Sequence, residues 1–529
     1  MTTSPLIKRM SRVALLVAAA AFPTAVLAAD VTLKSSDGTV NIVGEFIDFK
    51  DDHYVVRTAL GDLRIAAARV RCDGADCPVF DTTVSDVKLA GSDAMGTGLM
   101  PLLMSGFASF LDAEASTVAT PQEGQLITTF TGDGGFGDEI GSYLVTSTSS
   151  ADAFQTLKQG AAEIGMSARR ILPQEARDLK KAGAGNMVSP QQEHIVAIDS
   201  LVVITHPENE VQSMTMAQLR QIYTGEITNW SALGGEDRPI KVIGRDVNSG
   251  TSSIFNARVF GDESAALTDD LVVASGNNAV AAMVNEDPGA VGYVGYAFQR
   301  GAKAVTLIND CGIPMVPDAF SARTEEYALQ RRLYLYNRAD LAAPKAQSFM
   351  SYAVSKDADA VIAKAGFIDL GVDLRKQSLE GERARMLLNP SADTFESGVM
   401  REMLGQMLEY DRLSTTFRFK TGSFKMDERG RIDLARLVAY LKDRRAGTKV
   451  LVVGFTDSVG AFESNRDLSK GRAGEVMNTL KEVGAGQIDH VSMDYTGFGE
   501  IAPSACNIDD NGRAINRRVE IWIERTGQS

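Results

Sequence analysis

Apolar and polar residues alternate in short runs between residues 30 and 88. Examples are "VTLKSSDGTVNIVGEF" and "HYVVRTALGDLRIAAARV", and the runs are broken by "SDG" and "LGD". A period of two indicates strands with one buried face, and glycine with aspartate favours turns between them. We therefore expect a small all-β domain at 30–88, to which the pattern assigns no function.

A different rhythm follows at 89–374. Apolar runs such as "AIDSLVVIT", "IKVIG" and "GAVGYVGY" alternate with helical patterns such as "LMPLLMSGFASFL". The segment "TMAQLRQIY" begins with Thr215 and has Gln218 three residues later, which is the pattern of a helix capping box. Strands alternating with helices predict an α/β domain, with a ligand near the strand ends.

The two remaining parts of the long chain also show regular patterns. Residues 375–412 are expected to form a helical connector, and 413–529 a second α/β unit with strands "TFRFKT", "KVLVVGF", "VSMDYTGF" and "RVEIWIE". At the N-terminus, basic residues precede the apolar run "VALLVAAAAF", and "AVLAAD" supplies small residues for cleavage. This arrangement predicts a signal peptide at 1–29 and hence an exported protein.

Charge and cysteine content narrow the compartment and the partners. The formal net charge is -14 and no basic stripe is present, which argues against a nucleic-acid partner. Four cysteines suit an oxidising compartment. Cys72 and Cys77, in "VRCDGADCP", are expected to form a disulfide that closes a small loop. Whether Cys311 and Cys506 bridge two domains is left open by the sequence.

The stretch "GRDVNSGTSSIF" is unusually rich in hydrogen-bond donors for an acidic chain. Arg245 offers a two-pronged donor, Ser249 and Thr251 add hydroxyls, and Gly250 allows close approach to the backbone. The run that follows reads as the start of a helix, whose free N–H groups attract anions. The residues suit an anion site; the alternative is a surface pair of Arg245 with Asp246 beside an ordinary helix cap.

Three further donor-rich segments lie in the same α/β region. Ser92 stands in "GSDAMGTGLMPLL", Ser149 belongs to the hydroxyl run in "TSTSSADAF", and Ser167 and Arg169 follow a short strand in "AEIGMSARRI". Four such segments in one region suit a ligand enclosed between two lobes.

The longest motifs of this region are "MTMAQLRQIYTGEITNWSALGGEDRPIKVIGRDVNSGTSSIF", "PGAVGYVGYAF" and "EEYALQRRLYLY". On these, residues 89–374 resemble the periplasmic phosphate-binding component of ABC transporters. The resemblance implies two lobes that close over dehydrated phosphate or a related oxyanion, with an ABC permease as a candidate partner. Either "STSS" or "TGDGGFGDE" matches the family's first-lobe loop, which leaves the anion open. The implied anion-binding residues are Ser92, Ser149, Ser167, Arg169, Arg245, Ser249, Gly250 and Thr251.

A carboxylate in the pocket would select among oxyanions. It accepts a hydrogen bond from the proton of monohydrogen phosphate but repels fully ionised sulfate. Asp93 and Asp246 are the candidates for this acceptor, and for Asp246 we favour the role of orienting Arg245.

The segment "VVGFTDSVGAFESNRDLSKGRAGEVMNTLKEVG" places polar residues on one side of a helix. Asn465, Ser469 and Arg472 are separated by four and seven residues and therefore share a face. Two interpretations are open for Arg472. It forms a structural salt bridge with Asp457, or the two make a site in which Asp457 binds an ammonium and Arg472 a carboxylate.

The motifs "GFTDSVGAFESNRDLSKGRA", "GFGEIAPSACN" and "NGRAINRRVEIWI" resemble the C-terminal peptidoglycan-binding domain of outer-membrane protein A. The resemblance covers about 413–525 and implies a domain that clasps the diaminopimelate of uncrosslinked stem peptides. Phe455 stands where the family often has histidine; it lies beside the site, so binding should persist. The implied peptidoglycan-binding residues are Asp457, Asn465, Arg472 and Arg517.

Catalytic signatures are missing from the sequence. The four histidines are scattered without metal-ligand spacing, and neither a nucleophile elbow nor a phosphate-cradling loop appears. We expect no enzyme, metal or cofactor. The expected fold is a two-lobed periplasmic-binding-protein α/β domain, preceded by the small all-β domain and followed by an outer-membrane protein A-like α/β sandwich. The function hypothesis is a periplasmic phosphate receptor associated with peptidoglycan or the outer membrane; the alternative is an envelope structural protein tethered to peptidoglycan.

Overall fold

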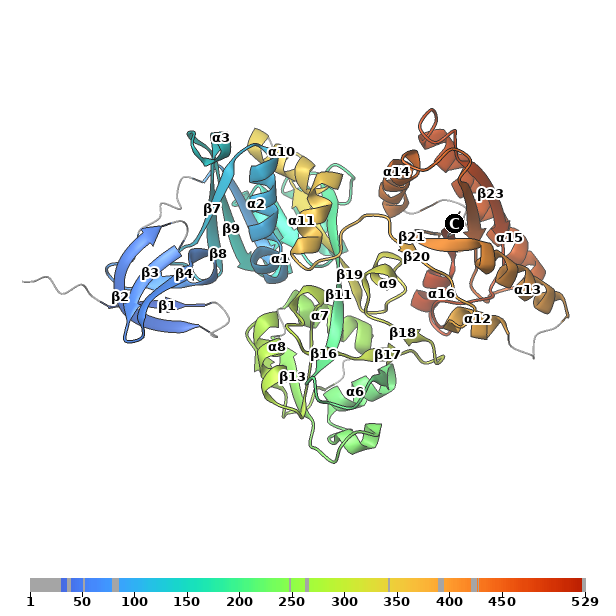
Figure 1. The fold of residues 1–529 in the computed structure, drawn as a ribbon, viewed down its shortest axis with the longest axis horizontal. Coiled ribbons are helices and arrows are strands. Elements are labelled where there is room, and N and C mark those ends of the chain that lie inside the picture. The colour runs from blue at the N-terminus through green and yellow to red at the C-terminus, as the bar shows by residue number, and fades with distance from the viewer. Residues whose placement is uncertain are drawn as a thin grey trace, which may run out of the picture.

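The computed structural model describes residues 30–525 except 36–39, 51–52, 79–84, 247–248, 262–265, 341–342, 389–393, 420–425 and 427. The expected signal peptide therefore lies outside the described residues. Along the described chain a small β-sheet is followed by two lobes and then by a C-terminal domain (Figure 1).

The N-terminal domain is one antiparallel sheet in the order β4-β3-β2-β1-β5. Alternate residues of its strands, such as Val31 and Leu33, are buried, and they pack against Val118 and Leu144 of the next domain. The expected disulfide between Cys72 and Cys77 is confirmed, with 5.8 Å between the Cα atoms. The strands are β1 (Asp30–Lys34), β2 (Asn41–Lys50), β3 (His53–Thr58), β4 (Gly61–Ala66) and β5 (Arg71–Asp73).

A single large sheet then runs through both lobes, in the order β14-β13-β15-β11-β19-β10-β6-β9-β8-β7. We define lobe 1 as 87–192 with 343–370, and lobe 2 as 206–329. Two long strands, β11 (Glu193–Thr205) and β19 (Gln330–Asn337), join the lobes and pair antiparallel with each other (Figure 1). The other strands of the two lobes are β6 (Val87–Ser92), β7 (Glu114–Ala119), β8 (Gln125–Thr131), β9 (Glu139–Thr148), β10 (Ile164–Ser167), β12 (Ser213–Thr215), β13 (Lys241–Arg245), β14 (Val272–Ala274), β15 (Ala290–Gly295), β16 (Lys303–Ala304), β17 (Thr306–Ile308) and β18 (Pro314–Met315).

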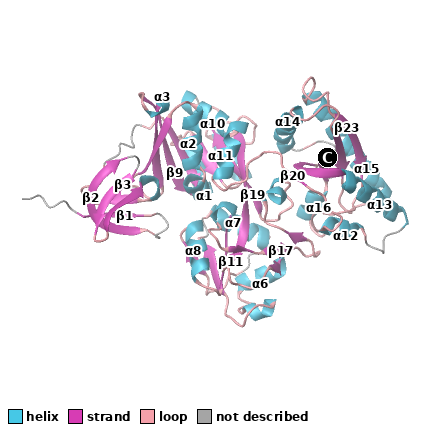
Figure 2. Ribbon diagram, in the orientation of Figure 1, coloured by secondary structure: helices cyan, strands magenta, loops and turns pink. Residues whose placement is uncertain are grey.

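Helices cover this sheet, and several begin where a strand ends at the boundary between the lobes (Figure 2). The expected capping box of Thr215 and Gln218 is present at the start of α6. One apolar core runs from lobe 1 through the shared sheet and a second lies within lobe 2. The helices are α1 (Asp93–Gly98), α2 (Met100–Phe110), α3 (Gly132–Gly135), α4 (Ser150–Gln159), α5 (Pro173–Lys181), α6 (Met216–Thr224), α7 (Gly250–Val259), α8 (Asn277–Glu286), α9 (Ala319–Arg323), α10 (Pro344–Ala353) and α11 (Asp359–Lys364).

The C-terminal domain has a mixed sheet in the order β20-β21-β24-β22-β23, with an apolar cluster on each face. Helices α14 and α15 pack on one face, and the segment expected to be a helical connector forms α12 and α13 on the other. These helices contribute to the apolar core of the C-terminal domain, so the segment expected to be a connector is part of that domain. The elements are β20 (Leu374–Arg375), α12 (Glu382–Leu387), α13 (Thr394–Glu409), β21 (Tyr410–Arg418), α14 (Glu428–Lys442), β22 (Lys449–Gly454), α15 (Phe462–Val483), β23 (Ser492–Gly497), α16 (Asp510–Asn516) and β24 (Arg518–Glu524).

A covalent and ionic interface holds the C-terminal domain against the two lobes. Cys311 of lobe 2 is disulfide-bonded to Cys506, with 5.6 Å between the Cα atoms, which answers the question that the sequence left open. Glu326 of lobe 2 pairs with Arg412 of β21 at 2.8 Å. Burial opposes ionisation of Glu326, but Arg412 holds the pKa of this carboxyl well below its usual range.

Two properties of the described residues bear on function class. Within the described ranges, no helix combines the length and apolar character needed to cross a membrane. Across the same residues, histidine, cysteine, aspartate and glutamate side chains form no group of three or more that could hold a metal ion.

Candidate ligand sites

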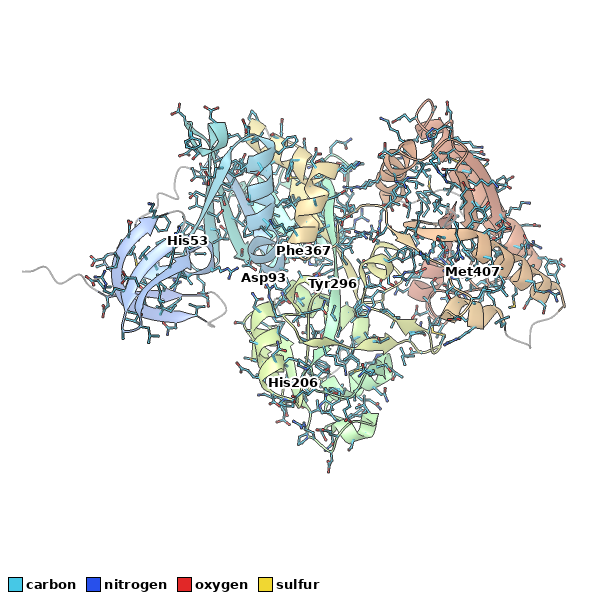
Figure 3. The ribbon with its side chains drawn as sticks, in the orientation of Figure 1. His53, Asp93, His206, Tyr296, Phe367 and Met407 are labelled. Atoms are coloured by element: carbon cyan, nitrogen blue, oxygen red, sulfur yellow. A yellow bond between two sulfur atoms is a disulfide. The ribbon has the colours of Figure 1, made fainter. Side chains whose placement is uncertain are left out.

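An arginine of lobe 2 meets an aspartate of lobe 1 where the two lobes face each other. Arg245 ends β13 and Asp93 begins α1, which Figure 3 places at the junction of the lobes. Their Nη2 and Oδ2 atoms lie 2.8 Å apart, and only 4% of the Arg245 side chain is exposed. Asp93, from the opposite lobe, thus orients Arg245, and the role favoured for Asp246 stays a prediction.

The rest of the Arg245 guanidinium group is buried but unsatisfied. Its Nε and Nη1 atoms have no hydrogen-bond partner among the described residues. Buried polar groups are normally paired, because leaving one unpaired costs about 1–3 kcal/mol, and more for a charged group. Two donor nitrogens of Arg245 are therefore buried beside the contact between the lobes without an acceptor, which a bound anion would supply.

The N-terminus of α7 lies in the same cleft. Ser249 caps this helix, accepting hydrogen bonds from the backbone N–H groups of Thr251 and Ser252 at 3.2 and 3.5 Å. A Cβ atom added to Gly250 would lie 2.9 Å from the Oγ atom of Ser150 in lobe 1. The absence of a side chain at Gly250 thus lets the helix ends of the two lobes approach closely.

A buried ion pair beneath the cleft supports Thr251. Arg331 donates through Nη1 to the Thr251 Oγ1 atom at 3.1 Å and pairs with Asp199 at 2.6 Å. Because Thr251 accepts from Arg331, its own hydroxyl proton is left to donate elsewhere. Arg331 and Asp199 lie opposite each other on β19 and β11.

Sequence reasoning missed this pair. The motif "QRRLYLY" drew attention to the strand, and alternation along a strand predicts that Arg331 and Arg332 point to opposite faces. Arg332 indeed pairs with Glu325 instead. The sequence has no signal that Asp199 would be the partner of Arg331, since 132 residues separate the two.

The serines of lobe 1 divide into cleft residues and structural residues. Ser92 is buried at the start of α1. Ser149 caps α4 in a reciprocal arrangement with Asp152, so its hydroxyl is occupied. Ser150 is the residue that faces Gly250, and its Oγ atom accepts from the Ala168 N–H group at 3.0 Å. The structure therefore corrects Ser149 to Ser150 as the cleft serine of this helix.

The side chains of the turn after β10 also form hydrogen bonds within lobe 1. The Ser167 hydroxyl donates to the Arg169 carbonyl oxygen at 2.7 Å and accepts from the Arg169 N–H group. The two terminal nitrogens of Arg169 bond to Glu175 at 2.7 and 2.8 Å. The Ser167 hydroxyl and the two terminal nitrogens of Arg169 are thus engaged within the domain, so an anion-binding role for either residue stays a prediction.

A second polar site lies within the C-terminal domain. Asp457 follows β22, and its Oδ2 atom accepts from Arg517 Nη1 at 2.6 Å. Asn465 donates to the backbone carbonyl oxygen of Asp457 at 3.3 Å. Asp457 thus forms an ion pair with Arg517, and the expected partner Arg472 is a charged neighbour that interacts electrostatically with Asp457.

Burial shapes the charges of this site. Arg472 is 1% exposed and its guanidinium group lies 5.3 Å from the ring centre of Phe419. Burial and the nearby Arg517 lower the pKa of Arg472, whereas Asp457 raises it. Glu500, which sequence reasoning missed, accepts from the Asn465 side chain. Burial raises the pKa of Glu500, and the neighbouring Asp457 adds to this effect.

Phe455 takes no part in the site. It lies in the apolar cluster on the other face of the sheet, with the guanidinium group of Arg518 4.0 Å from its ring centre. The replacement of the family's frequent histidine by Phe455 therefore changes a contact in the apolar core.

The two sites border one cavity at the domain interface. Ala168 and Arg331 on the side of the lobes, and Phe419 and Arg517 on the C-terminal side, line the same space of about 480 Å³. A ligand entering this cavity would be close to both sites.

Comparison with known families agrees with this division of the chain. The PBP superfamily domain matches residues 82–357, which is more than half of the 529-residue chain. The chain belongs to the PBP superfamily. The OmpA family matches residues 418–517. Both resemblances and the expected fold class, with its small all-β sheet, two-lobed domain and OmpA-like domain, are confirmed.

Individual relatives match one part each. Phosphate-binding protein PstS of Bacillus subtilis is 28% identical over 222 residues, covering 41% of this chain and 68% of the relative. Outer membrane porin F of Pseudomonas aeruginosa is 35% identical over 117 residues, covering 22% of this chain and 32% of the porin. A solved phosphate-bound putative phosphate ABC transporter substrate-binding protein from Clostridium perfringens is 24% identical, covers 54% of this chain and 98% of its own, and has a TM-score of 0.41.

Proposed function

We propose that this protein is a periplasmic receptor that captures phosphate, or a similar oxyanion, between its lobes while its C-terminal domain holds it to peptidoglycan. The observation that carries the first half is the pair of buried, unsatisfied Arg245 nitrogens between the lobes. Similarity to phosphate-binding relatives supports phosphate as the anion.

In this proposal the anion is held mainly by oriented dipoles. Arg245 donates through Nε and Nη1, Thr251 through its hydroxyl, and the α7 N-terminus through its backbone at Gly250. Ser92 and Ser150 line the lobe 1 side. Arg245 bonds to the Oδ2 atom of Asp93, so the Oδ1 atom of Asp93 is left to accept the proton of monohydrogen phosphate and to repel sulfate.

The C-terminal half of the proposal is a grip on the free end of a stem peptide. Arg472 binds the carboxylate of diaminopimelate and Asp457 its ammonium group, with Asn465 and Arg517 positioning Asp457. Similarity to the OmpA family supports this role. In this role the protein lies in the periplasm, associated with peptidoglycan or the outer membrane. Its phosphate-loaded closed form is the species that an ABC permease would recognise.

The domain limits form part of the proposal. They are a signal peptide at 1–29, the all-β domain at 30–88, the two-lobed domain at 89–374, the helical segment at 375–412 and the peptidoglycan-binding domain at 413–529.

Thermal unfolding of residues 30–529 tests which anion the protein binds. Phosphate, arsenate, sulfate, molybdate and chloride are compared at equal ionic strength. A ligand at about 100 times its dissociation constant adds about 2.7 kcal/mol to the stability of the state that binds it. We expect a rise in Tm with phosphate and little with sulfate. If no oxyanion shifts Tm, the receptor proposal is wrong and the tethered structural protein takes its place.

A further inference from the structure

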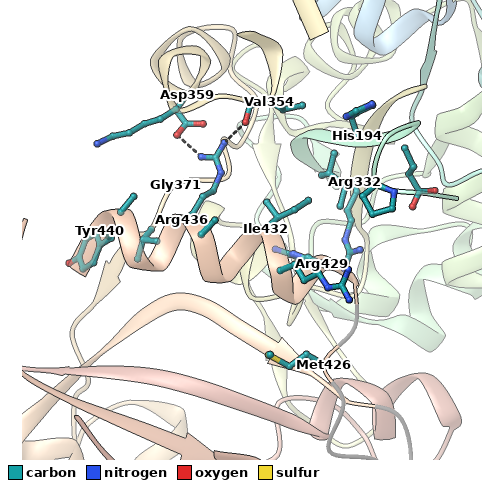
Figure 4. Close-up of a pocket in the computed structure, with 18 of the residues that line it drawn as sticks. His194, Arg332, Val354, Asp359, Gly371, Met426, Arg429, Ile432, Arg436 and Tyr440 are labelled. Carbon is teal, nitrogen blue, oxygen red and sulfur yellow. Dashed lines mark hydrogen bonds and ion pairs between the residues drawn. The ribbon is translucent and has the colours of Figure 1, made fainter. Parts of the chain in front are cut away.

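A large cavity lies away from both sites, between lobe 1 and helix α14 of the C-terminal domain. Its volume is about 1180 Å³, and none of the residues proposed for phosphate or peptidoglycan lines it. Figure 4 shows α14 forming one wall, with Ile432, Arg436 and Tyr440 on the side of the helix that faces Val354 and His194. The proposed function leaves this cavity without a role.

Helix α14 is apolar on two faces. One face belongs to the C-terminal core and consists of Leu434, Leu437, Val438 and Leu441. The other consists of Ile432, Ala435 and Ala439, spaced by three and four residues, which are exposed and line the cavity. A solvent-facing helix surface is normally polar, so this second stripe indicates a face that is covered in the working protein.

The opposite wall continues the apolar surface. Val188, Ile195 and Val354 of lobe 1 and the joining strand line the cavity. Val188 and Ile432 each keep 36% of their surface exposed, although they lie on facing walls of one cavity. The walls are thus too far apart to bury each other.

Positive charge surrounds this apolar space. Seven cationic and three acidic side chains line the cavity, whereas the whole chain has a net charge of -14. Arg436 is used internally, since it pairs with Asp359 at 2.6 Å and donates to the Val354 carbonyl oxygen (Figure 4). Lys356 and Arg431 are exposed and have no ion pair within the described part of the chain, so their charges are available to an anion.

The cavity exists before any ligand arrives because its two walls are fixed relative to each other. The Cys311–Cys506 disulfide joins lobe 2 to the C-terminal domain, and Arg436 joins α14 to lobe 1. Arg429 at the start of α14 also pairs with Glu325. A preformed space avoids part of the ordering cost of binding.

We propose that this cavity binds an anionic amphiphile: one elongated apolar chain that carries a single phosphate or carboxylate group. The apolar stripe from Ile432 to Ala439 extends about 10 Å along the helix and suits the chain. Lys356 and Arg431 receive the charged group. A small anion would leave the stripe uncovered, and a neutral apolar molecule would leave the two cations without a partner.

Isothermal titration of residues 30–529 with dodecyl phosphate below its micelle concentration tests the proposal. Inorganic phosphate is present in excess throughout, so that the cleft between the lobes is occupied. We expect dodecyl phosphate to bind roughly tenfold or more tightly than dodecyl maltoside, which has the same chain and no charge. Binding by Arg245→Ala should equal that of the original protein, because the cleft is not involved.

Two variants locate the ligand. Ala435→Trp fills the cavity and should weaken binding roughly tenfold or more, whereas Lys442→Trp, an exposed position on the same helix outside the cavity, should not. Lys356→Glu keeps the cavity open and should weaken the binding of dodecyl phosphate but not that of dodecyl maltoside. Unchanged binding in both Ala435→Trp and Lys356→Glu, equal affinity for the two amphiphiles, or no binding heat would each overturn the proposal.

Discussion

The cleft between the lobes and the site in the C-terminal domain both contain an arginine paired with an aspartate, but the pairs are built differently. Arg245 and Asp93 are 152 residues apart and belong to different lobes. Asp457 and Arg517 are 60 residues apart in one domain. The first pair therefore depends on the closed arrangement of two lobes, whereas the second forms when a single domain folds.

The pairs also differ in what they leave unsatisfied. In the cleft, Nε and Nη1 of Arg245 are buried without partners among the described residues. In the C-terminal site, Arg517 and Asn465 already bond to Asp457. An anion in the cleft would satisfy these donors, whereas the ammonium group of a stem peptide would have to compete with Arg517 for Asp457. We expect tighter binding in the cleft than in the wall site.

The largest expected effect is that of Arg245→Ala. Removing one partner of a buried charged contact costs about 3–5 kcal/mol, so phosphate affinity should fall by roughly 100-fold or more. Titration calorimetry measures the loss. Lys241→Ala, at the exposed start of the same strand, should bind phosphate normally. A threefold effect or less would show that the cleft is not the site.

Asp457→Ala and Arg472→Ala should each reduce retention on purified peptidoglycan by roughly tenfold, because a charged hydrogen bond contributes about 1.5–3 kcal/mol. Phosphate affinity should stay unchanged in both variants, which keeps the two sites separable. Lys481→Ala, at an exposed position near the end of α15, is the matched control. Full retention of both variants, with the fold verified by circular dichroism, would remove the wall assignment.

Asp93→Asn keeps the shape of the cleft and removes the negative charge of the Asp93 carboxylate. If Asp93 accepts the proton of phosphate, the preference for phosphate over sulfate should fall by about tenfold, or 1.4 kcal/mol. Competition titrations with the two anions measure the ratio. An unchanged ratio with weaker binding of both anions would mean that Asp93 only orients Arg245.

Glu500→Gln should have the smallest effect, and it depends on pH. Burial raises the pKa of Glu500 in the folded protein, so its proton stabilises the fold at low pH and its ionisation weakens the fold as pH rises. Glutamine keeps an acceptor for Asn465 without the charge. We expect a gain of about 0.5 kcal/mol at pH 8, after allowance for solvent screening.

Urea unfolding measures the free energy of unfolding of Glu500→Gln and of the original protein at pH 4 and pH 8. The ordinary pKa of glutamate is about 4.3, so the two pH values favour the protonated and the ionised carboxyl group, respectively. The gain should be present at the higher pH and shrink at the lower one. An equal difference at both pH values would contradict a raised pKa.

Much of the fold could be predicted because it depends on neighbouring residues. Alternation marked the strands of the first sheet, and the capping box of Thr215 and Gln218 marked the start of α6. The short spacing between Cys72 and Cys77 predicted a local disulfide, and that disulfide is present. The motifs around Arg245 and Asp457 were long enough to indicate two families.

The composition of each site was harder to predict, because donors that look alike in sequence have different neighbours in space. Arg169 appeared suitable for an anion, yet Glu175 occupies it, whereas Arg331 supports Thr251 from a distant strand. Ser149 and Ser150 are adjacent, and only the orientation of α4 decides that Ser150 faces Gly250.

Residue patterns were therefore enough to predict the strands, the helices, the capping box at Thr215 and the two family resemblances, because these depend on backbone preferences and motifs within short segments. Tertiary structure alone decided that Asp93 orients Arg245, that Cys311 bonds Cys506, and that the stripe at Ala435 lines a cavity. Each of these contacts joins segments far apart in the chain. Their formation depends on how whole domains pack, which no local pattern of residues records.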